Sequence, residues 1–491
     1  MKNLITVLLI IPQFLLAQQW TEDLQNPNKN FYEIQEKFNE YWENKTYEKG
    51  KGWKQFKRWE NFMEQRVFPD GEMHPEILFE ESQRIQDNSA PISNNVWTQI
   101  GPDNVPLVSS GSKRGIGRVN TIAFHPTDPD KIYIGAPAGG FWKSDNGGQT
   151  WSTTTDFLSN LGVSDITLNP NNPNEIFIIT GDRDAGDTYS YGLMKSIDGG
   201  NTFNTTGLSF NITSYYRGNR VLIDPANTNV IIVSTSNGIY RSADGGVTFA
   251  NTFSSANMTD IEFHPTNTNI VYGASKGNTS IYKSTDNGIS WSQSGSGLPS
   301  TSSVVRACVA VTPDNPSAVY ALFGDNNNGY YGVYKSMNEG QTWSQQSNSP
   351  NLLGWSTTGS DSDGQAWYDL AFACDPNNEE ILFVGGVNTW KSTDGGQNWS
   401  LNTHWTGSGG ADYKHADVHM LKYNPLNDYI YSGNDGGLYV STNNGGNWTD
   451  ISDGIQISQF YSLGVSQTVQ DMVITGAQDN GTFLKDGTNW D

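Results

Sequence analysis

One eight-residue pattern recurs along this chain and constrains its fold more than any other feature. The pattern is Ser-x-Asp/Asn-x-Gly-x-Thr/Ser/Asn-Trp/Phe, and successive copies are 52, 46, 42, 52, 56 and 49 residues apart. The seven copies begin at Ser144, Ser196, Ser242, Ser284, Ser336, Ser392 and Ser441. Repeats of this period are small units that bury their apolar faces only by stacking on neighbours. The pattern therefore predicts one repeat array in place of several unrelated domains.

A second pattern alternates with these boxes. It is an apolar strand that ends in x-Pro, then a polar turn and another β-branched strand, as in residues 121–126 followed by residues 131–134. Each unit thus has about four short strands, joined by turns at the proline and at the Asp/Asn-Gly pair. Four-stranded units in series are typical of a β-propeller. We predict an all-β fold with a propeller of about seven or eight four-stranded blades, or a part of a larger ring.

The boxes have an architectural explanation. Glycine supplies the positive φ of a tight hairpin, and the Asp or Asn side chain accepts backbone amides across the same turn. The closing Trp or Phe fills space between neighbouring blades. We therefore assign a structural role to the third position of each box, which is Asn146, Asp198, Asp244, Asp286, Asn338, Asp394 and Asn443. A single carboxylate per box is far short of the six or more oxygens that calcium needs.

The residues before the array have a different composition. Residues 20–95 carry 25 charged side chains in 76 positions, whereas residues 96–491 carry 54 in 396. The first region shows helical spacing of its apolar residues, as in Phe31, Ile34 and Phe38. We predict a helical segment over residues 18–95 and a propeller over residues 96–491. The helical segment is either packed on the propeller or a propeptide that is removed after export.

The first residues predict export. Lys2 is followed by a short apolar run and then by Ala17 and two glutamines, which is typical of a signal peptide over residues 1–17. We expect a secreted protein, extracellular or on the outer cell surface, with no membrane insertion. The net charge of −22 argues against binding to nucleic acid. Cys308 and Cys374 lie in buried-strand patterns and are expected to be free thiols.

The boxes resemble the Asp-boxes, or bacterial neuraminidase repeats, of sialidases, xyloglucanase-type hydrolases and sortilin-type receptors. Residues 364–370, 433–437 and 476–482 look typical of the sortilin-type repeat proteins that bacteria export by the type IX route. This resemblance implies a cell-surface propeller and says little about chemistry, because folds of this kind carry unrelated functions. Members of that group usually end in a separate sorting domain, and this sequence has none, so the export route is only implied.

One short segment stands out from the repeats as a candidate site. On an innermost strand, His415, Asp417 and His419 would alternate onto one face beside the central channel. Two imidazoles and a carboxylate could bind a ligand or a transition metal or zinc. A polar network that only orders the blade is the alternative. No cofactor is predicted beyond this possible structural metal ion.

Two further loops could bind a ligand. Arg183 and Asp184 belong to an acidic loop that could reach the channel mouth, and the alternative is a solvated loop with local ion pairs. Asp361 and Asp363, together with Trp367, could bind and stack a sugar, unless Trp367 belongs to the core.

Two functions remain open. The first is a non-enzymatic exported propeller that binds a protein or a glycan. The alternative is an endo-acting glycoside hydrolase, whose two carboxylates would come from Asp417, Asp369 and Asp435. Xyloglucanase-type enzymes resemble this array but carry an Asp just before Gly-Gly in the first repeat, whereas residues 135–140 contain no acid. The ligand, the oligomeric state and the completeness of the ring are not predicted.

Overall fold

The computed structural model describes residues 23–24, 26, 28–47, 52–87, 99–104, 115–487 and 489–490, so the predicted signal peptide lies outside the described residues. The chain divides into two compact units, Met1–Ile77 and Leu78–Asp491. Among the described residues, no helix is long and apolar enough to cross a bilayer.

The first unit has a small aromatic core, as the helical spacing predicts. Helices α2 (Phe31–Trp42) and α3 (Trp53–Met63) bury Phe31, Ile34, Phe38 and Phe56. The rings of Phe38 and Phe56 stack with their centroids 3.6 Å apart. Helix α4 (Pro75–Asp87) follows. Removal of this segment after export stays a prediction.

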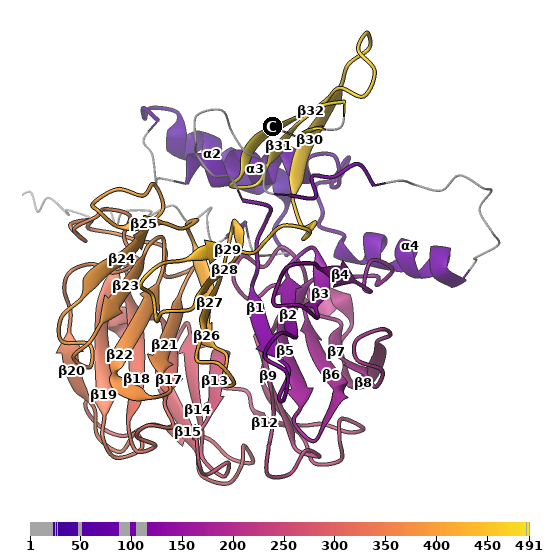
Figure 1. Cartoon of the computed structure of the whole chain (residues 1–491). Coiled ribbons are helices and arrows are strands. Elements are labelled where there is room, and N and C mark those ends of the chain that lie inside the picture. Colours follow the sequence, from indigo (N-terminus) through magenta and orange to yellow (C-terminus); the bar gives the residue numbers. More distant parts are fainter. Residues whose placement is uncertain are drawn as a thin grey trace, which may run out of the picture. The chain divides into compact units, whose positions relative to one another are not determined.

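The second unit consists of short antiparallel strands in groups of four (Figure 1). The first four groups are β1 (Thr121–Phe124), β2 (Ile132–Ala136), β3 (Gly140–Ser144), β4 (Ser152–Thr153); β5 (Val163–Asn169), β6 (Asn172–Thr180), β7 (Gly192–Ser196), β8 (Asn204–Ser209); β9 (Gly218–Ile223), β10 (Ile231–Thr235), β11 (Gly238–Ser242), β12 (Ala250–Phe253); and β13 (Asn257–Phe263), β14 (Val271–Lys276), β15 (Ile281–Ser284), β16 (Ser292–Gln293). The next three are β17 (Val304–Val311), β18 (Val319–Asp325), β19 (Tyr330–Ser336), β20 (Ser344–Ser347); β21 (Ala371–Asp375), β22 (Asn378–Gly385), β23 (Thr389–Ser392), β24 (Ser400–His404), with β25 (Asp412–Tyr413) added in parallel; and β26 (Val418–Tyr423), β27 (Ile430–Asn434), β28 (Gly437–Ser441), β29 (Thr449–Asp450). The last is β30 (Phe460–Val465), β31 (Val473–Ala477), β32 (Gly481–Asp486), β33 (Asn489–Trp490).

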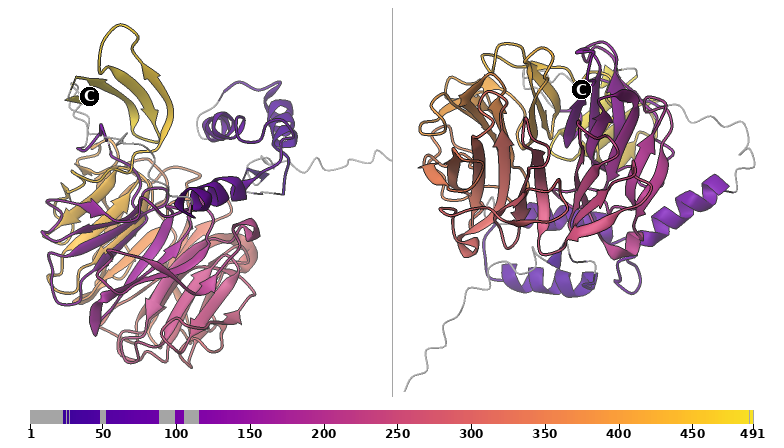
Figure 2. Two further views of the ribbon diagram at one scale, coloured as in Figure 1. Left: turned by 90° about the vertical axis from the view of Figure 1, so that its right-hand side faces the viewer. Right: turned by 90° about the horizontal axis from the view of Figure 1, so that it is seen from below.

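Seven of these groups form a closed β-propeller. The first strands β1, β5, β9, β13, β17, β21 and β26 contact one another in that order, and β26 contacts β1. An apolar cluster closes the ring, because Ile122 and Ile134 of the first blade pack with Tyr431 and Leu438 of the seventh. The eighth sheet, β30–β33, lies outside the ring (Figure 2). The expected four-stranded units and propeller are therefore confirmed, with seven blades in the ring and one sheet beside it.

Each box forms the turn between the third and fourth strands of its blade. Asp198 shows the arrangement, since its Oδ1 accepts the backbone N–H of Thr202 at 2.9 Å and its Oδ2 accepts the Thr202 hydroxyl at 2.7 Å. In the next box, the equivalent hydrogen bonds from Thr248 lower the pKa of Asp244 to about 2. The carboxylates of the boxes are therefore used within their own turns.

A basic residue before most of the boxes links neighbouring blades. Six of the seven boxes follow a Lys or Arg, and five of these donate to a backbone carbonyl in the next box. The five bonds are Lys143 to Gly199, Lys195 to Gly245, Arg241 to Asn287, Lys283 to Glu339 and Lys391 to Asn444. Four of the five closing tryptophans donate in the opposite direction, to the preceding blade, as Trp399 does to Ser347 at 3.0 Å. The seventh box follows Val440, which packs in the cluster that closes the ring.

We expect Lys391→Met to lower the free energy of unfolding by about 1–2 kcal/mol, because the 2.7 Å charge-assisted bond to the Asn444 carbonyl is lost while the apolar stem is kept. Urea unfolding followed by tryptophan fluorescence measures this. Lys131→Met is the control, because its ion pair to Asp145 is 4.0 Å long and exposed. An equal loss in both variants would contradict the interblade role.

Candidate functional site

The candidate residues lie at one end of the ring, which we call the channel entrance. The start of each first strand is paired with the end of the second strand, as Val163 is with Thr180 and Val418 with Asn434. Loops that lead into first strands and loops between second and third strands therefore meet there. The boxes lie at the opposite end.

His415, Asp417 and His419 do not alternate along a strand. Strand β26 begins at Val418, Asp417 has a left-handed φ of 62°, and the pairing shifts register between Val418 and Met420. A bulge of this kind reverses the two-residue alternation. The expectation of one common face was therefore wrong.

The same segment does not form a metal site. His419 bonds Asp184 Oδ2 through Nδ1 at 3.0 Å and Asp435 Oδ1 through Nε2 at 2.9 Å, so both ring nitrogens are engaged. Among the described residues, no three His, Cys, Asp or Glu side chains are grouped to hold a metal ion. His415 and Asp417 are partly exposed at the entrance, whereas His419 is buried.

Asp184 is the centre of a buried charge network. It accepts from Arg306 Nη2 at 2.6 Å and lies 3.3 Å from Arg183 Nε, in addition to His419. All four side chains are buried. The alternative of a solvated loop around Arg183 and Asp184 was therefore wrong. Inside the ring, Asp184 contacts Arg306 and His419, and Arg183 donates to the His419 carbonyl, so both residues link different blades.

The network continues to the entrance. The Tyr368 hydroxyl donates to Asp435 at 2.7 Å, and Arg118 donates to Asp182 at 2.7 Å and to Tyr368 at 3.4 Å. The sequence analysis did not single out Tyr368, Arg118, Asp182 or Arg306 for this role.

These contacts set the protonation of the network. Burial alone would raise the pKa of Asp184, but Arg183, Arg306 and His419 outweigh it and hold that pKa well below its usual range. Burial alone would lower the pKa of His419, but its bonds to Asp184 and Asp435 raise it to about 8. Asp435 also keeps a lowered pKa, because bonds from His419 and Tyr368 overcome the effect of burial.

Asp417 and Asp369 lie where burial and neighbouring carboxylates raise the pKa, in contrast to Asp184 and Asp435. Asp417 accepts a long bond from Gln365 at 3.4 Å, and burial, Asp435 and Asp479 raise its pKa well above the usual value. Asp369 is fully buried, and its carboxyl group lies close enough to that of Asp417 to share a hydrogen bond with it. Burial and Asp417 raise its pKa strongly. Asp417 is thus a partly exposed carboxyl group that holds its proton more tightly than usual.

Asp479 is a carboxylate that the sequence analysis missed as a site residue. It lies in the turn between β31 and β32, with a left-handed φ of 54°, and is partly exposed. The neighbouring Asn480 donates to the Asp435 carbonyl at 3.0 Å, which ties this turn to the entrance. The only sequence signal was its position within residues 476–482.

Aromatic side chains also lie on entrance loops. Trp355 and Trp405 are 41% and 37% exposed, and His404 Nε2 lies 3.1 Å from the Trp355 carbonyl. Trp367 is half-buried. Asp361 accepts the Ser356 amide at 2.6 Å. The Asp361 and Asp363 carbonyls both bond Asn351, so these two acids help to order their own loop.

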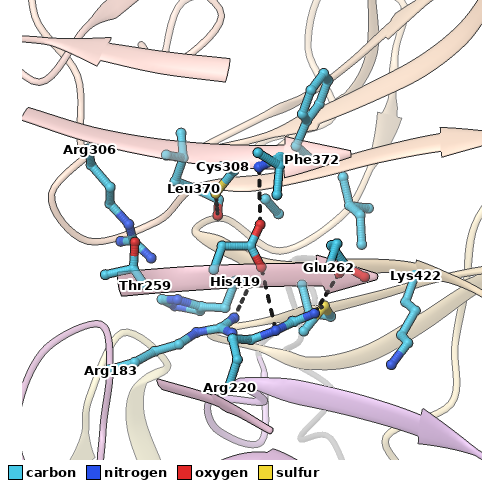
Figure 3. Close-up of a pocket in the computed structure, with 15 residues that line it drawn as sticks. Arg183, Arg220, Thr259, Glu262, Arg306, Cys308, Leu370, Phe372, His419 and Lys422 are labelled. Carbon is cyan, nitrogen blue, oxygen red and sulfur yellow. Dashed lines mark hydrogen bonds and ion pairs between the residues drawn. The ribbon is translucent and has the colours of Figure 1, made fainter. Parts of the chain in front are cut away.

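Side chains of several blades lie inside the ring (Figure 3). A cavity of about 60 Å³ is lined by Arg220, Glu262 and Lys422, among others, which leaves room for little more than water. Arg220 Nη2 pairs with Glu262 at 2.7 Å, and its Nε lies 3.4 Å from Asp260. Arg183, Arg220 and Arg306, which line this cavity, are thus already paired with carboxylates.

The cysteines lie in the apolar core. Cys308 and Cys374 are free and buried. Burial raises the pKa of the Cys308 thiol to about 12, so it is not a nucleophile. The expectation of free core thiols is confirmed.

Lys414 is a buried amine with few polar partners. It is 1% exposed, donates to Ser432 Oγ at 2.8 Å and lies 4.4 Å from the Trp448 ring centroid. Burial holds its pKa well below the usual value. Because the unfolded state binds the proton more tightly, this residue destabilises the fold at neutral pH, and that cost shrinks as pH rises.

We expect Lys414→Met to raise the free energy of unfolding at pH 7 by about 1–3 kcal/mol, the order of the cost of an under-paired buried polar group. The gain should decrease toward pH 10. Thermal unfolding of both proteins from pH 6 to 10 measures this, and a gain that does not change with pH would contradict the assignment.

Comparison with known proteins identifies relatives for part of the chain. No family model matches it. The chain is 27% identical over 348 residues to Xyloglucanase Xgh74A of Acetivibrio thermocellus, a match that covers 62% of this chain and 40% of that protein. It is 26% identical over 241 residues to a xyloglucanase of Hypocrea jecorina, which covers 47% of this chain and 26% of that one. The chain thus spans less than half the length of the curated relatives that it matches.

Solved structures support the fold. A GH74 enzyme of Niastella koreensis superposes with a TM-score of 0.57 at 20% identity, over 79% of this chain and 60% of that one. A GH74 xyloglucanase of Xanthomonas campestris also gives a TM-score of 0.57, at 17% identity, over 75% and 59%. This chain is therefore a β-propeller, and its matches point to xyloglucanase-type propellers rather than to the sortilin-type group in particular.

Proposed function

We propose that this chain is an exported glycoside hydrolase that acts on a polysaccharide, with Asp417 and Asp479 at the channel entrance as its two reacting carboxyl groups. The observation that carries this proposal is a partly exposed acid, Asp417, whose pKa is raised beside a second partly exposed carboxylate. The likeness to xyloglucanases supports hydrolysis over binding alone.

The different surroundings of Asp417 and Asp479 suggest a separate role for each in hydrolysis. Hydrolysis of a glycosidic bond needs one protonated carboxyl to donate to the leaving oxygen and a second, ionised one on the other side of the bond. Asp417 keeps its proton because it is buried on one side and faces Asp435 and Asp479. We assign the second role to Asp479.

Two of the carboxyl groups expected from the sequence act indirectly in this proposal. Asp369 is fully buried and Asp435 is 3% exposed, so neither reaches a polysaccharide. Asp435, held ionised by His419 and Tyr368, keeps a negative charge near Asp417 and so favours its protonated form. Both are positioning residues.

A propeller that only binds its ligand is the second candidate. The loop between β2 and β3 opens at the channel entrance, and residues 135–140 contain no acid there. A glycan or a protein could then be held by the exposed Trp355 and Trp405 without cleavage.

A hydrolysis assay separates the two candidates. We expect purified protein to release new reducing ends from at least one soluble plant or algal polysaccharide, with xyloglucan as the first substrate to test. Affinity electrophoresis on the same polysaccharides measures binding independently. Binding without reducing ends on any substrate would overturn the hydrolase and support the binding module.

A further inference from the structure

A short turn just before β21, residues 365–369, carries side chains that contact the acids of the channel entrance, and we call it the entrance turn. Gln365 donates from Nε2 to Asp417 Oδ1 at 3.4 Å, and the Tyr368 hydroxyl donates to Asp435 Oδ2 at 2.7 Å. The Gln365 carbonyl accepts the Tyr368 amide at 2.8 Å and so closes the turn. A movement of the entrance turn would therefore change the contacts of both acids.

Two basic side chains from neighbouring blades hold the entrance turn by its backbone. Lys276, the last residue of β14, donates from Nζ to the Trp367 carbonyl at 2.9 Å. Arg306 of β17 donates from Nη1 to the Tyr368 carbonyl at 3.0 Å and to the Trp367 carbonyl at 3.4 Å. The two residues thus share one acceptor and fix two successive carbonyls of the turn.

The placement of Lys276 costs stability. Lys276 and Arg306 are directly opposite each other where β14 pairs with β17, and like charges in that position are unfavourable. Burial, followed by Arg306, lowers the pKa of Lys276 to about 7, although Asp184 and Asp182 act in the opposite direction. A lysine with a lowered pKa in the folded state destabilises the fold at neutral pH. Costly local arrangements are typical of functional sites, which favours a role for Lys276 beyond folding.

We propose that Lys276 is a positioning residue for Asp417, and that it acts through the entrance turn. By holding the Trp367 carbonyl, Lys276 keeps the Gln365 amide against Oδ1 of Asp417. An amide N–H bonds to the carboxyl oxygen that lacks the proton, so this contact directs the proton of Asp417 to Oδ2. From there it can pass to the leaving oxygen of the polysaccharide. The role in catalysis rests on the proposed function of Asp417, whereas the hold of Lys276 on the turn does not.

Kinetics of three variants test the positioning role. Lys276→Met removes the donor and keeps an apolar stem, so we expect kcat for polysaccharide hydrolysis to fall about 10- to 100-fold, the cost of a misplaced reacting group, with little change in KM. Lys276→Arg should recover part of the rate. Gln365→Met should lower kcat similarly. The double variant Lys276→Met/Gln365→Met should be no slower than the slower single variant, because both substitutions remove one contact.

Hydrogen–deuterium exchange tests the hold on the turn independently of activity. The amides of Tyr368 and Asp369 both donate to the Gln365 carbonyl, and we expect them to exchange faster in Lys276→Met than in wild type. Lys391→Met is the matched control, because Lys391 also joins two blades through a backbone carbonyl but lies at the opposite end of the ring. It should leave both kcat and the exchange of the entrance turn unchanged. Circular dichroism establishes that each variant is folded.

The outcomes separate this proposal from the proposed function. Unchanged exchange of the entrance turn in Lys276→Met would overturn the hold on the turn. Faster exchange with an unchanged kcat would overturn the positioning role, as would multiplicative losses in the double variant or an equal loss of kcat in Lys391→Met. Wild-type protein that cleaves no polysaccharide would overturn the proposed function and the positioning role together, and the exchange experiment would still decide whether Lys276 holds the turn.

Discussion

Asp417→Asn is expected to lower the kcat of polysaccharide hydrolysis by about 10²–10⁴-fold, the usual contribution of a general acid. The amide has the shape of the carboxyl group but cannot donate a proton to the leaving oxygen. Substrate contacts made by the rest of the entrance are unchanged, so KM should change far less than kcat. Reducing-end assays over a range of polysaccharide concentrations measure both constants.

The pH profile gives this prediction a second test. Asp417 must be protonated to act, and burial with its acidic neighbours raises its pKa, so the wild-type rate should fall as pH rises through that raised pKa. Asp198→Asn is the matched control, because asparagine stands naturally at the same box position in Asn146, Asn338 and Asn443. An Asp417→Asn enzyme that keeps more than a tenth of the wild-type kcat would exclude Asp417 as the acid.

Asp184→Ala is expected to lower the free energy of unfolding by about 3–5 kcal/mol, the cost of leaving buried charges without their partner. The substitution removes the one carboxylate that faces Arg183, Arg306 and His419. The three cations come from different blades, so the loss should affect the closed ring as a whole. Urea unfolding measures the change, and Asp198→Asn again serves as the control, expected to change stability far less because asparagine occupies the same position in other boxes.

The same network predicts how stability depends on pH. The pKa of His419 is raised to about 8, so its contribution is fully present below its unfolded value near 6.5 and is lost as pH rises through 8. That loss is about 2 kcal/mol. The pKa of Asp184 is lowered, so its contribution is present above about 3.9 and disappears only as pH falls through its low folded value. Because buried Lys414 contributes in the opposite direction, the difference in stability between wild type and His419→Gln isolates this term. A difference that stays constant from pH 6 to 9 would contradict the charged state of His419.

The local structure of the propeller could be predicted because its signals are local. A box such as residues 196–203 satisfies its own turn, with Asp198 bonded to Thr202 four residues later. The apolar alternation of strands and the proline turns act over similar distances. The prediction for His415, Asp417 and His419 failed for a local reason too, because a one-residue bulge at the start of β26 is not visible in a period-two pattern.

The candidate site could be predicted only in part. Asp417 was found because it belongs to a short unusual segment, and Asp184 because it lies in a charged loop. The sequence could not show what these residues do, because the raised pKa of Asp417 depends on Asp435 and Asp479, 18 and 62 residues later in the chain.

The sequence by itself determined the blades, because every hydrogen bond that defines a box or a hairpin lies within one repeat. The tertiary structure alone decided that seven blades close and that an eighth sheet lies beside them, since closure depends on the packing of Ile122 and Ile134 against Tyr431 and Leu438, about 300 residues apart. That closure also brings Asp184, Arg306 and His419 from the second, fifth and seventh blades to one point. Charges so far apart in the chain acquire partners, and shifted pKa values, only when the ring is complete.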